Sequence, residues 1–133
     1  MDDLQLLLSA DPDTTEIQLN ERYSLITSYS ELEEINTILP ILSDFVNLQI
    51  LDLSDNELKS LPLDLSSLTC LHSLDITNNP FESLVEVASS LQTLPLLRSL
   101  SINLQTNEEV ELILTSLPKL ELLNGQGIFL VKV

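Results

Sequence analysis

The side chains best suited to catalysis in this 133-residue chain are Cys70 and His72. They lie two positions apart, so on a strand they would share one face. A Cys–His pair can act as a dyad in which the histidine activates the thiol as a nucleophile. No third group stands at a recognisable spacing to orient the histidine. Cys70 also lies where two similar segments of the sequence meet, a place that is usually packed. We therefore interpret Cys70 as a packed residue and predict that the protein is not an enzyme.

The chain has few residues that could form a metal site or a phosphate-binding site. One histidine and one cysteine are too few ligands for a zinc site. The two glycines, Gly125 and Gly127, stand close together near the C-terminus, so they do not form a phosphate-binding loop. We expect no metal and no cofactor.

Two aspartates deserve more weight. Asp52 and Asp75 hold the same place in two similar segments, so on neighbouring parallel strands they would lie roughly 5 Å apart. Paired carboxylates can serve as acid and base, hold a cation, or receive a lysine or arginine from a partner. On an open, solvated sheet we favour the solvated or partner-binding interpretation.

The segments that hold these aspartates are copies of a repeat. Residues 48–58 read LQILDLSDNEL, and residues 71–81 repeat the pattern after 23 residues. Further copies start at Leu97 and Leu120, and a degenerate first copy covers residues 14–19. Alternation of apolar and polar residues predicts one short strand per copy, and stacked copies must bury each other's apolar faces. The residues expected to point inward are Leu51, Leu53, Leu74, Ile76, Leu100 and Ile102.

The pattern L-x-x-L-x-L-x-x-N at this period resembles the leucine-rich repeat. The stretch 117–125, LPKLELLNG, is similar to the C-terminal cap of intracellular leucine-rich repeat proteins of the SDS22-like and acidic nuclear phosphoprotein (ANP32-like) groups. This resemblance implies an α/β solenoid: a right-handed curved coil with a parallel, concave β-sheet and with short helices and 3₁₀ turns on the convex side. It also implies a single domain over 1–133, with an N-terminal cap at 1–13, repeats at 14–119, and a C-terminal cap and tail at 120–133.

An asparagine follows each of the two best-matching strands. The turn out of a strand leaves backbone N–H and C=O groups inside the coil, and an amide side chain can satisfy both kinds of group. We expect Asn56 and Asn79 to stack in this role. The third copy has Gln105 at the equivalent place, so the pattern does not predict the structure of the turn after Ile102.

The segments between the strands differ in their predicted structure. Residues 58–68 contain a proline and are expected to be extended or 3₁₀, whereas residues 85–94 have helical spacing of apolar residues. A second helix is predicted from a cap at Asn107 up to Pro118. The capping box of Ser30 and Glu33 predicts a further helix, which Pro40 would break or end.

Charge and length restrict the class of protein. Twenty-one acidic residues face five lysines and arginines, giving a net charge of −16. Such a charge repels phosphate backbones and anionic membranes, and it favours basic partners or simply keeps a leucine-rich chain soluble. The acidic start lacks the features of a signal peptide, and no apolar run reaches the length of a membrane span. We expect a cytoplasmic or nuclear protein that is a monomer on its own.

The repeat register predicts a polar, acidic surface on the outer face of the strands. We predict that this surface binds a protein with a basic or amphipathic segment, rather than nucleic acid or a membrane. It has no aromatic anchor, so Tyr23, Tyr29 and the N-terminal acids form a second candidate surface. The predicted partner-binding residues are Gln18, Ile50, Asp52, Ser54, Asp55, Ser73, Asp75, Thr77, Ser99, Ser101 and Asn103.

The resemblance does not choose one partner. It implies a phosphatase catalytic subunit, a cytoskeletal or ciliary motor component, or a nuclear assembly. Two alternatives remain: an acidic escort of basic nuclear proteins, and a structural subunit or repeat block of a larger complex or longer chain. The escort proteins carry a long acidic tail that this chain lacks, whereas the apolar ending at Val133 favours the repeat block.

Overall fold

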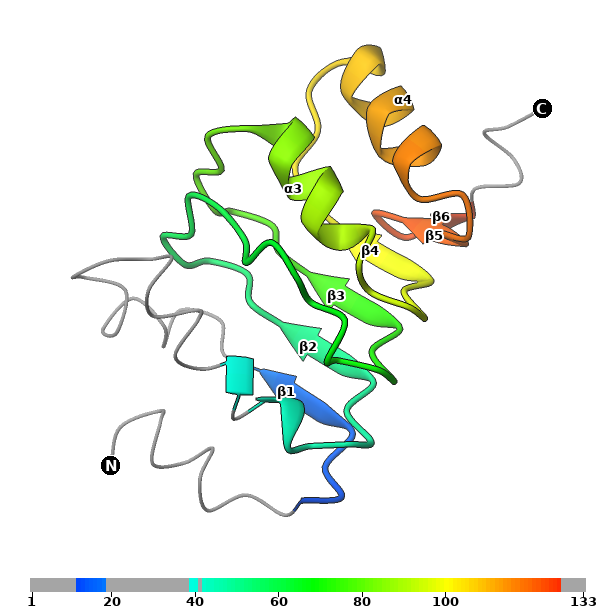
Figure 1. Ribbon diagram of the computed structural model, residues 1–133. Coiled ribbons are helices and arrows are strands. Elements are labelled where there is room, and N and C mark those ends of the chain that lie inside the picture. Colours follow the sequence, from blue (N-terminus) through cyan, green and yellow to red (C-terminus); the bar gives the residue numbers. More distant parts are fainter. Residues whose placement is uncertain (1–11, 19–38, 41, 128–133) are drawn as a thin grey trace.

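Short strands recur where the repeats place them. A computed structural model describes residues 12–18, 39–40 and 42–127, and in this part of the chain the strands form one six-stranded sheet in sequence order (Figure 1). All neighbours pair in parallel except the last two, which are antiparallel. The strands are β1 (Glu16–Gln18), β2 (Ile50–Asp52), β3 (Ser73–Asp75), β4 (Ser99–Ser101), β5 (Leu122–Leu123) and β6 (Gln126–Gly127).

One buried row runs through the parallel strands. Ile17, Leu51, Leu74, Leu100 and Leu123 are aligned by the ladder register, and each side chain is buried. Burial of one such side chain contributes about 1.5–3 kcal/mol, and each is covered only because another repeat lies beside it. The prediction of one inward-pointing layer per repeat is confirmed. The residues just after the strands, Leu53, Ile76 and Ile102, are buried as well.

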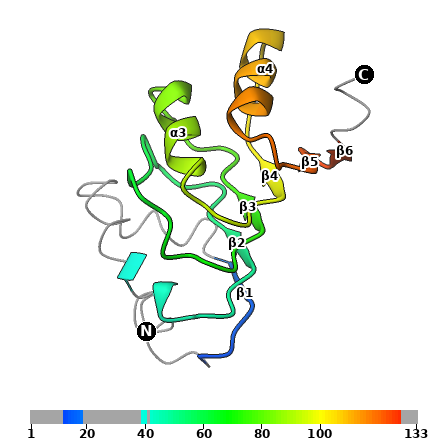
Figure 2. The same ribbon diagram turned by 45° about the vertical axis from the view of Figure 1, so that its right-hand side comes forward.

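Two helices lie on one side of the sheet, as Figures 1 and 2 show. Helix α3 covers Leu84–Leu91 and helix α4 covers Asn107–Ser116, so both predicted helices are present. Helix α3 ends earlier than residue 94. Val87 and Leu91 of α3, together with Ile113 of α4, are buried in the core.

The N-terminus of α4 differs from its prediction. The cap is Thr106 rather than Asn107, which is the first helical residue. The Thr106 hydroxyl accepts a hydrogen bond from the Glu109 N–H, and the Glu109 carboxylate accepts one from the Thr106 N–H. This reciprocal capping box satisfies two N–H groups that the first turn of a helix leaves unpaired.

The earlier connecting segments are less regular. Residues 58–68 contain no helix, which confirms the extended prediction, and Leu58, Leu61, Leu65 and Leu68 point into the core. Residues 39–40 and 42–43 are helical, and residue 41 between them lies outside the described residues, so the expectation that Pro40 breaks or ends a helix stays a prediction. The predicted capping box at Ser30 and Glu33, the two tyrosines, residues 1–11 of the N-terminal cap and the tail 128–133 lie outside the described residues.

The two repeat asparagines occupy the interior of the turns as predicted. The Asn56 amide donates to the carbonyls of Leu53 and Ser54, at 2.9 and 3.2 Å. The Asn79 amide donates to its own turn at Ile76 and Thr77, and also reaches Leu53 O of the preceding repeat at 3.0 Å.

Asn79 also accepts a hydrogen bond. Its Oδ1 receives the N–H of Leu58, 21 residues earlier, at 3.2 Å. The same amide therefore closes one turn and ties it to the turn below. The stacking predicted for these asparagines is confirmed.

The third repeat replaces this arrangement. Gln105 is exposed, and its N–H donates to the Glu109 carboxylate at 2.7 Å as part of the entry into α4. The N–H of Ile102 donates to Asn124 Oδ1 of the fourth copy, at 2.8 Å, whereas the equivalent N–H groups of Leu53 and Ile76 donate to carbonyls of the next strand.

A tight hairpin ends the parallel array. Asn124 and Gly125 have φ angles of 51° and 81°, and they join β5 to the antiparallel strand β6. An Asn-Gly pair with both φ angles positive forms the two-residue turn that fits the twist of a hairpin. Strand β6 therefore covers the last parallel strand.

Replacement of Asn79 by alanine tests the asparagine stack. We expect Asn79→Ala to lower the free energy of unfolding by about 1–3 kcal/mol, because the Ile76 carbonyl and the Leu58 N–H lose a hydrogen-bond partner. Urea unfolding followed by circular dichroism measures the change. Gln105→Ala is the matched control at the equivalent position, where the exposed side chain predicts almost no change. Equal losses in the two variants would contradict the proposed role.

Candidate protein-interaction face

The open face is the face of the sheet opposite the one that α3 and α4 cover (Figure 2). It carries the first and third residues of each strand, which are exposed or half-buried in β2, β3 and β4 while the middle residue is buried. The register arranges these residues in two rows across the strands. The first row is Glu16, Ile50, Ser73, Ser99 and Leu122, and the second is Gln18, Asp52, Asp75 and Ser101.

Asp52 and Asp75 are register partners, as predicted. Each is half-buried and closes the turn that follows its strand. Asp52 Oδ1 accepts hydrogen bonds from the N–H and the hydroxyl of Ser54, at 2.9 and 2.6 Å. Asp75 Oδ1 accepts the same pair from Thr77, at 3.0 and 2.7 Å. The two carboxylates are therefore held rigidly, with one oxygen of each used by the fold.

Ser54 does not lie on the surface. Its side chain is 6% exposed, because the hydroxyl turns back to the Asp52 carboxylate. The expectation that Ser54 contacts a partner was therefore wrong. Thr77, its equivalent in the next repeat, is half-buried and keeps some surface.

A third row of polar residues follows the strand ends. Asp55 and Asn78 hold equivalent places with φ angles of 58°, a conformation that Asp and Asn tolerate better than other non-glycine residues. The Asn78 amide donates to Asp55 Oδ1 at 2.8 Å, and the Asn78 N–H donates to Asn103 Oδ1 at 2.5 Å. These exposed side chains form a fixed polar border beside the two aspartates.

One residue of the open face was missed by the sequence analysis. Leu122 is 42% exposed and lies in register with Ser99, at the end of the first row. The signal was present, because Leu122 stands 23 residues after Ser99. The fourth copy was interpreted only as a cap, so its outward position was not considered.

The electrostatics of the open face are one-sided. The described strands contain no lysine, arginine or histidine, and two carboxylates stand near the middle of the second row. Like charges on directly neighbouring strands repel each other, so a cation placed between them is favoured. Within the described residues no group of three or more histidine, cysteine or acidic side chains is arranged to hold a metal ion.

His72, the candidate partner of Cys70, is hydrogen-bonded to the backbone of the preceding repeat. His72 Nδ1 lies 2.8 Å from the carbonyl oxygen of Gln49 in the preceding repeat. A carbonyl oxygen can only accept, so Nδ1 is the donor and the ring is tied to the neighbouring backbone. Cys70 is a half-buried free thiol in the turn before β3.

Residues 46–89 match the family model described as Leucine Rich repeats (2 copies). These residues are leucine-rich repeats. The matched range holds β2 and β3, both asparagines of the stack and both central aspartates. A search of curated proteins gave no match. None of the helices in the described part of the chain is long and apolar enough to cross a membrane.

Substitutions of Asp75 separate its charge from its role in the turn. We expect Asp75→Ala to lower the free energy of unfolding by about 0.5–1.5 kcal/mol, because the Thr77 N–H and hydroxyl lose their acceptor. Asp75→Asn retains an oxygen at that position, so its unfolding midpoint in urea should stay close to that of the wild type. A loss in the asparagine variant as large as in the alanine variant would show that the charge, and not the hydrogen bond, holds the turn.

Proposed function

We propose that the open face binds a protein partner through a basic, amphipathic segment. Leucine-rich repeat domains generally mediate protein–protein interaction. The observation that carries the proposal is the pairing of Asp52 with Asp75 in the ladder register. The pair places two fixed negative charges about 5 Å apart on an exposed sheet face.

The carboxylates are suited to receive lysine or arginine. Only Oδ1 of Asp52 and of Asp75 is used by its turn, and within the described residues the second oxygen of each has no hydrogen-bond partner. Because the turns already fix these side chains, little conformational entropy is lost when a partner's cation binds. Net charge of −16 adds a long-range attraction for a basic partner, which speeds encounter at low salt.

The first row supplies apolar contacts beside the charges. Ile50 and Leu122 are 36% and 42% exposed, and they flank the small side chains of Ser73 and Ser99. Three strand spacings separate the two apolar residues, which is about 14 Å. That distance corresponds to two or three turns of an α-helix. A partner helix that crosses the strands could therefore place apolar residues on the first row and basic residues on the second.

The same features argue against other partners. The acidic face repels the phosphates of nucleic acids and the anionic surface of membranes.

The double variant Asp52→Asn with Asp75→Asn tests the proposal. It removes both charges but keeps the two turn acceptors, so the fold should be retained. We expect this variant to retain at least about fivefold less of the proteins that wild type retains from cell extract. Affinity purification followed by quantitative mass spectrometry measures the difference, at low and at moderate salt.

The control variant is Glu108→Gln with Glu111→Gln, which makes the same change in net charge on exposed positions of α4. It should retain the same proteins as wild type. If wild type, the aspartate variant and the control variant all retain the same proteins to the same extent, binding through the open face is contradicted. Binding that does not weaken with salt would contradict an electrostatic contact.

A further inference from the structure

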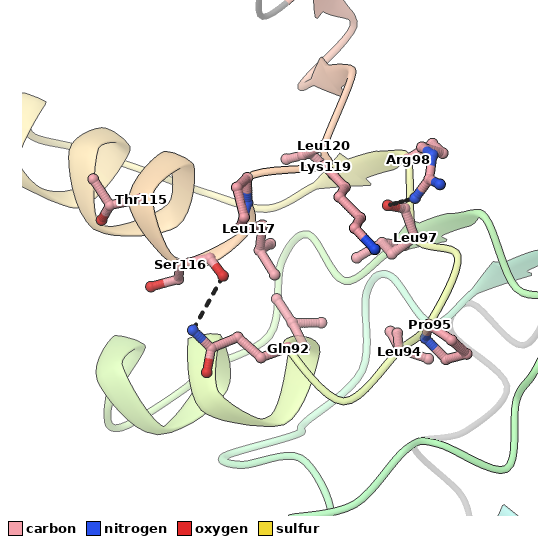
Figure 3. Close-up of a pocket in the computed structure, with 12 residues that line it drawn as sticks. Gln92, Leu94, Pro95, Leu97, Arg98, Thr115, Ser116, Leu117, Lys119 and Leu120 are labelled. Atoms are coloured by element: carbon pink, nitrogen blue, oxygen red, sulfur yellow. Dashed lines mark hydrogen bonds between the residues drawn. The ribbon is translucent and has the colours of Figure 1, made fainter.

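A second hollow lies away from the open face, where α3 and α4 end. It is a groove of about 440 Å³, within the range of about 300–1,000 Å³ that is common for binding sites. Its walls are the two segments that lead from the helices to β4 and β5 (Figure 3). At one end, Gln92 Nε2 donates to the Ser116 carbonyl at 3.1 Å and joins the two walls.

The walls have the same apolar pattern. Leu94-Pro95 in one wall corresponds to Leu117-Pro118 in the other, 23 residues later. The leucines are buried, whereas the prolines are exposed at the rim. Prolines lack an N–H donor, so the rim presents apolar rings without a backbone donor at those two positions.

The groove carries an unusual share of the chain's positive charge. Arg98 and Lys119 line it, and they are two of only five lysines and arginines in a chain with 21 acidic residues. Figure 3 shows the Lys119 side chain reaching from its wall toward Leu97. His72 borders an adjoining hollow of about 340 Å³ that shares Arg98 with the groove. Two of the chain's five lysines and arginines thus line one groove of an acidic molecule.

Arg98 already attracts a carboxylate. Its Nε lies 3.6 Å from Oε2 of Glu121, and both side chains are open to solvent, at 33% and 72% exposed. An exposed ion pair at this distance contributes at most about 1 kcal/mol, so a competing carboxylate can replace it. Lys119 is exposed and forms no ion pair within the described residues.

We propose that this groove binds a partner-protein segment that carries bulky aliphatic side chains next to a carboxylate. The aliphatic groups would pack on the exposed rings of Pro95 and Pro118 and on the small exposed part of the leucines beneath them, and the carboxylate would meet Lys119 and Arg98. Charge complementarity selects this occupant, since the groove is basic and the rest of the surface repels acidic segments. A second copy of the chain is disfavoured, because two molecules of charge −16 repel each other. The site is separate from the open face.

The test uses two defined peptides and backbone amide NMR on the full chain. The first is the acetylated and amidated peptide GLELLEG, and the second is GLQLLQG, which differs only in its charge. We expect the glutamate peptide to shift the amides of Leu97, Arg98, Lys119 and Leu120 in a saturable way. The glutamine peptide should bind at least about fivefold more weakly. The amides of Asp52 and Asp75 should not move.

Two matched variants complete the test. Lys119→Glu should weaken binding of the glutamate peptide by at least about fivefold. Lys59→Glu, the same change at an exposed site outside the groove, should leave that binding unchanged. Groove amides that do not move, or equal effects of the two peptides or of the two variants, would overturn the proposal. A dimer of this chain that covers Arg98 and Lys119 in sedimentation and NMR would also overturn it. None of these outcomes depends on the aspartates of the open face.

Discussion

The structure depends on asparagine amide groups that satisfy the backbone where strands β2 and β3 turn back. Asn79 is the clearest case, since it bonds carbonyls of its own turn and both a carbonyl and an N–H of the repeat before it. Leaving those groups unpaired inside the core would cost more than a leucine contact can return. The asparagine therefore fixes the conformation of the turn and the register between neighbouring repeats. The leucine rows pack only because that register is kept.

The candidate interaction face is a consequence of the same register. Because Leu51 and Leu74 are neighbours on the inner side, Asp52 and Asp75 must be neighbours on the outer side. Their hydrogen bonds to Ser54 and Thr77 then hold the carboxylates in place. The repetition that stabilises the core thus also places the same charged residue on neighbouring strands. These two carboxylates are fixed in position, unlike acidic side chains that are scattered and mobile.

Much of this arrangement follows from the 23-residue spacing. It predicts the parallel strands, the buried Leu51 and Leu74, the paired aspartates and the asparagine stack. Features that depend on a single side-chain rotamer were not predictable, such as the burial of Ser54 beneath Asp52. The helix cap at Thr106 was missed because asparagine is preferred over threonine at the N-cap, so Asn107 was the stronger candidate. The groove beside Lys119 arises from how α3 and α4 end relative to each other, which the repeated Leu-Pro pairs in its walls do not define by themselves.

Amide hydrogen exchange at Leu58 tests the central claim most directly, because its N–H bonds only to the Asn79 side chain in the described structure. NMR-detected exchange should show Leu58 strongly protected in the wild type. In Asn79→Ala the Leu58 amide should exchange far faster, while Leu53, which donates to the Asp75 carbonyl, should change little beyond the global loss of stability. If Leu58 already exchanges like an exposed loop amide in the wild type, the asparagine does not join the repeats, and the register must be held by the strand ladder and leucine packing.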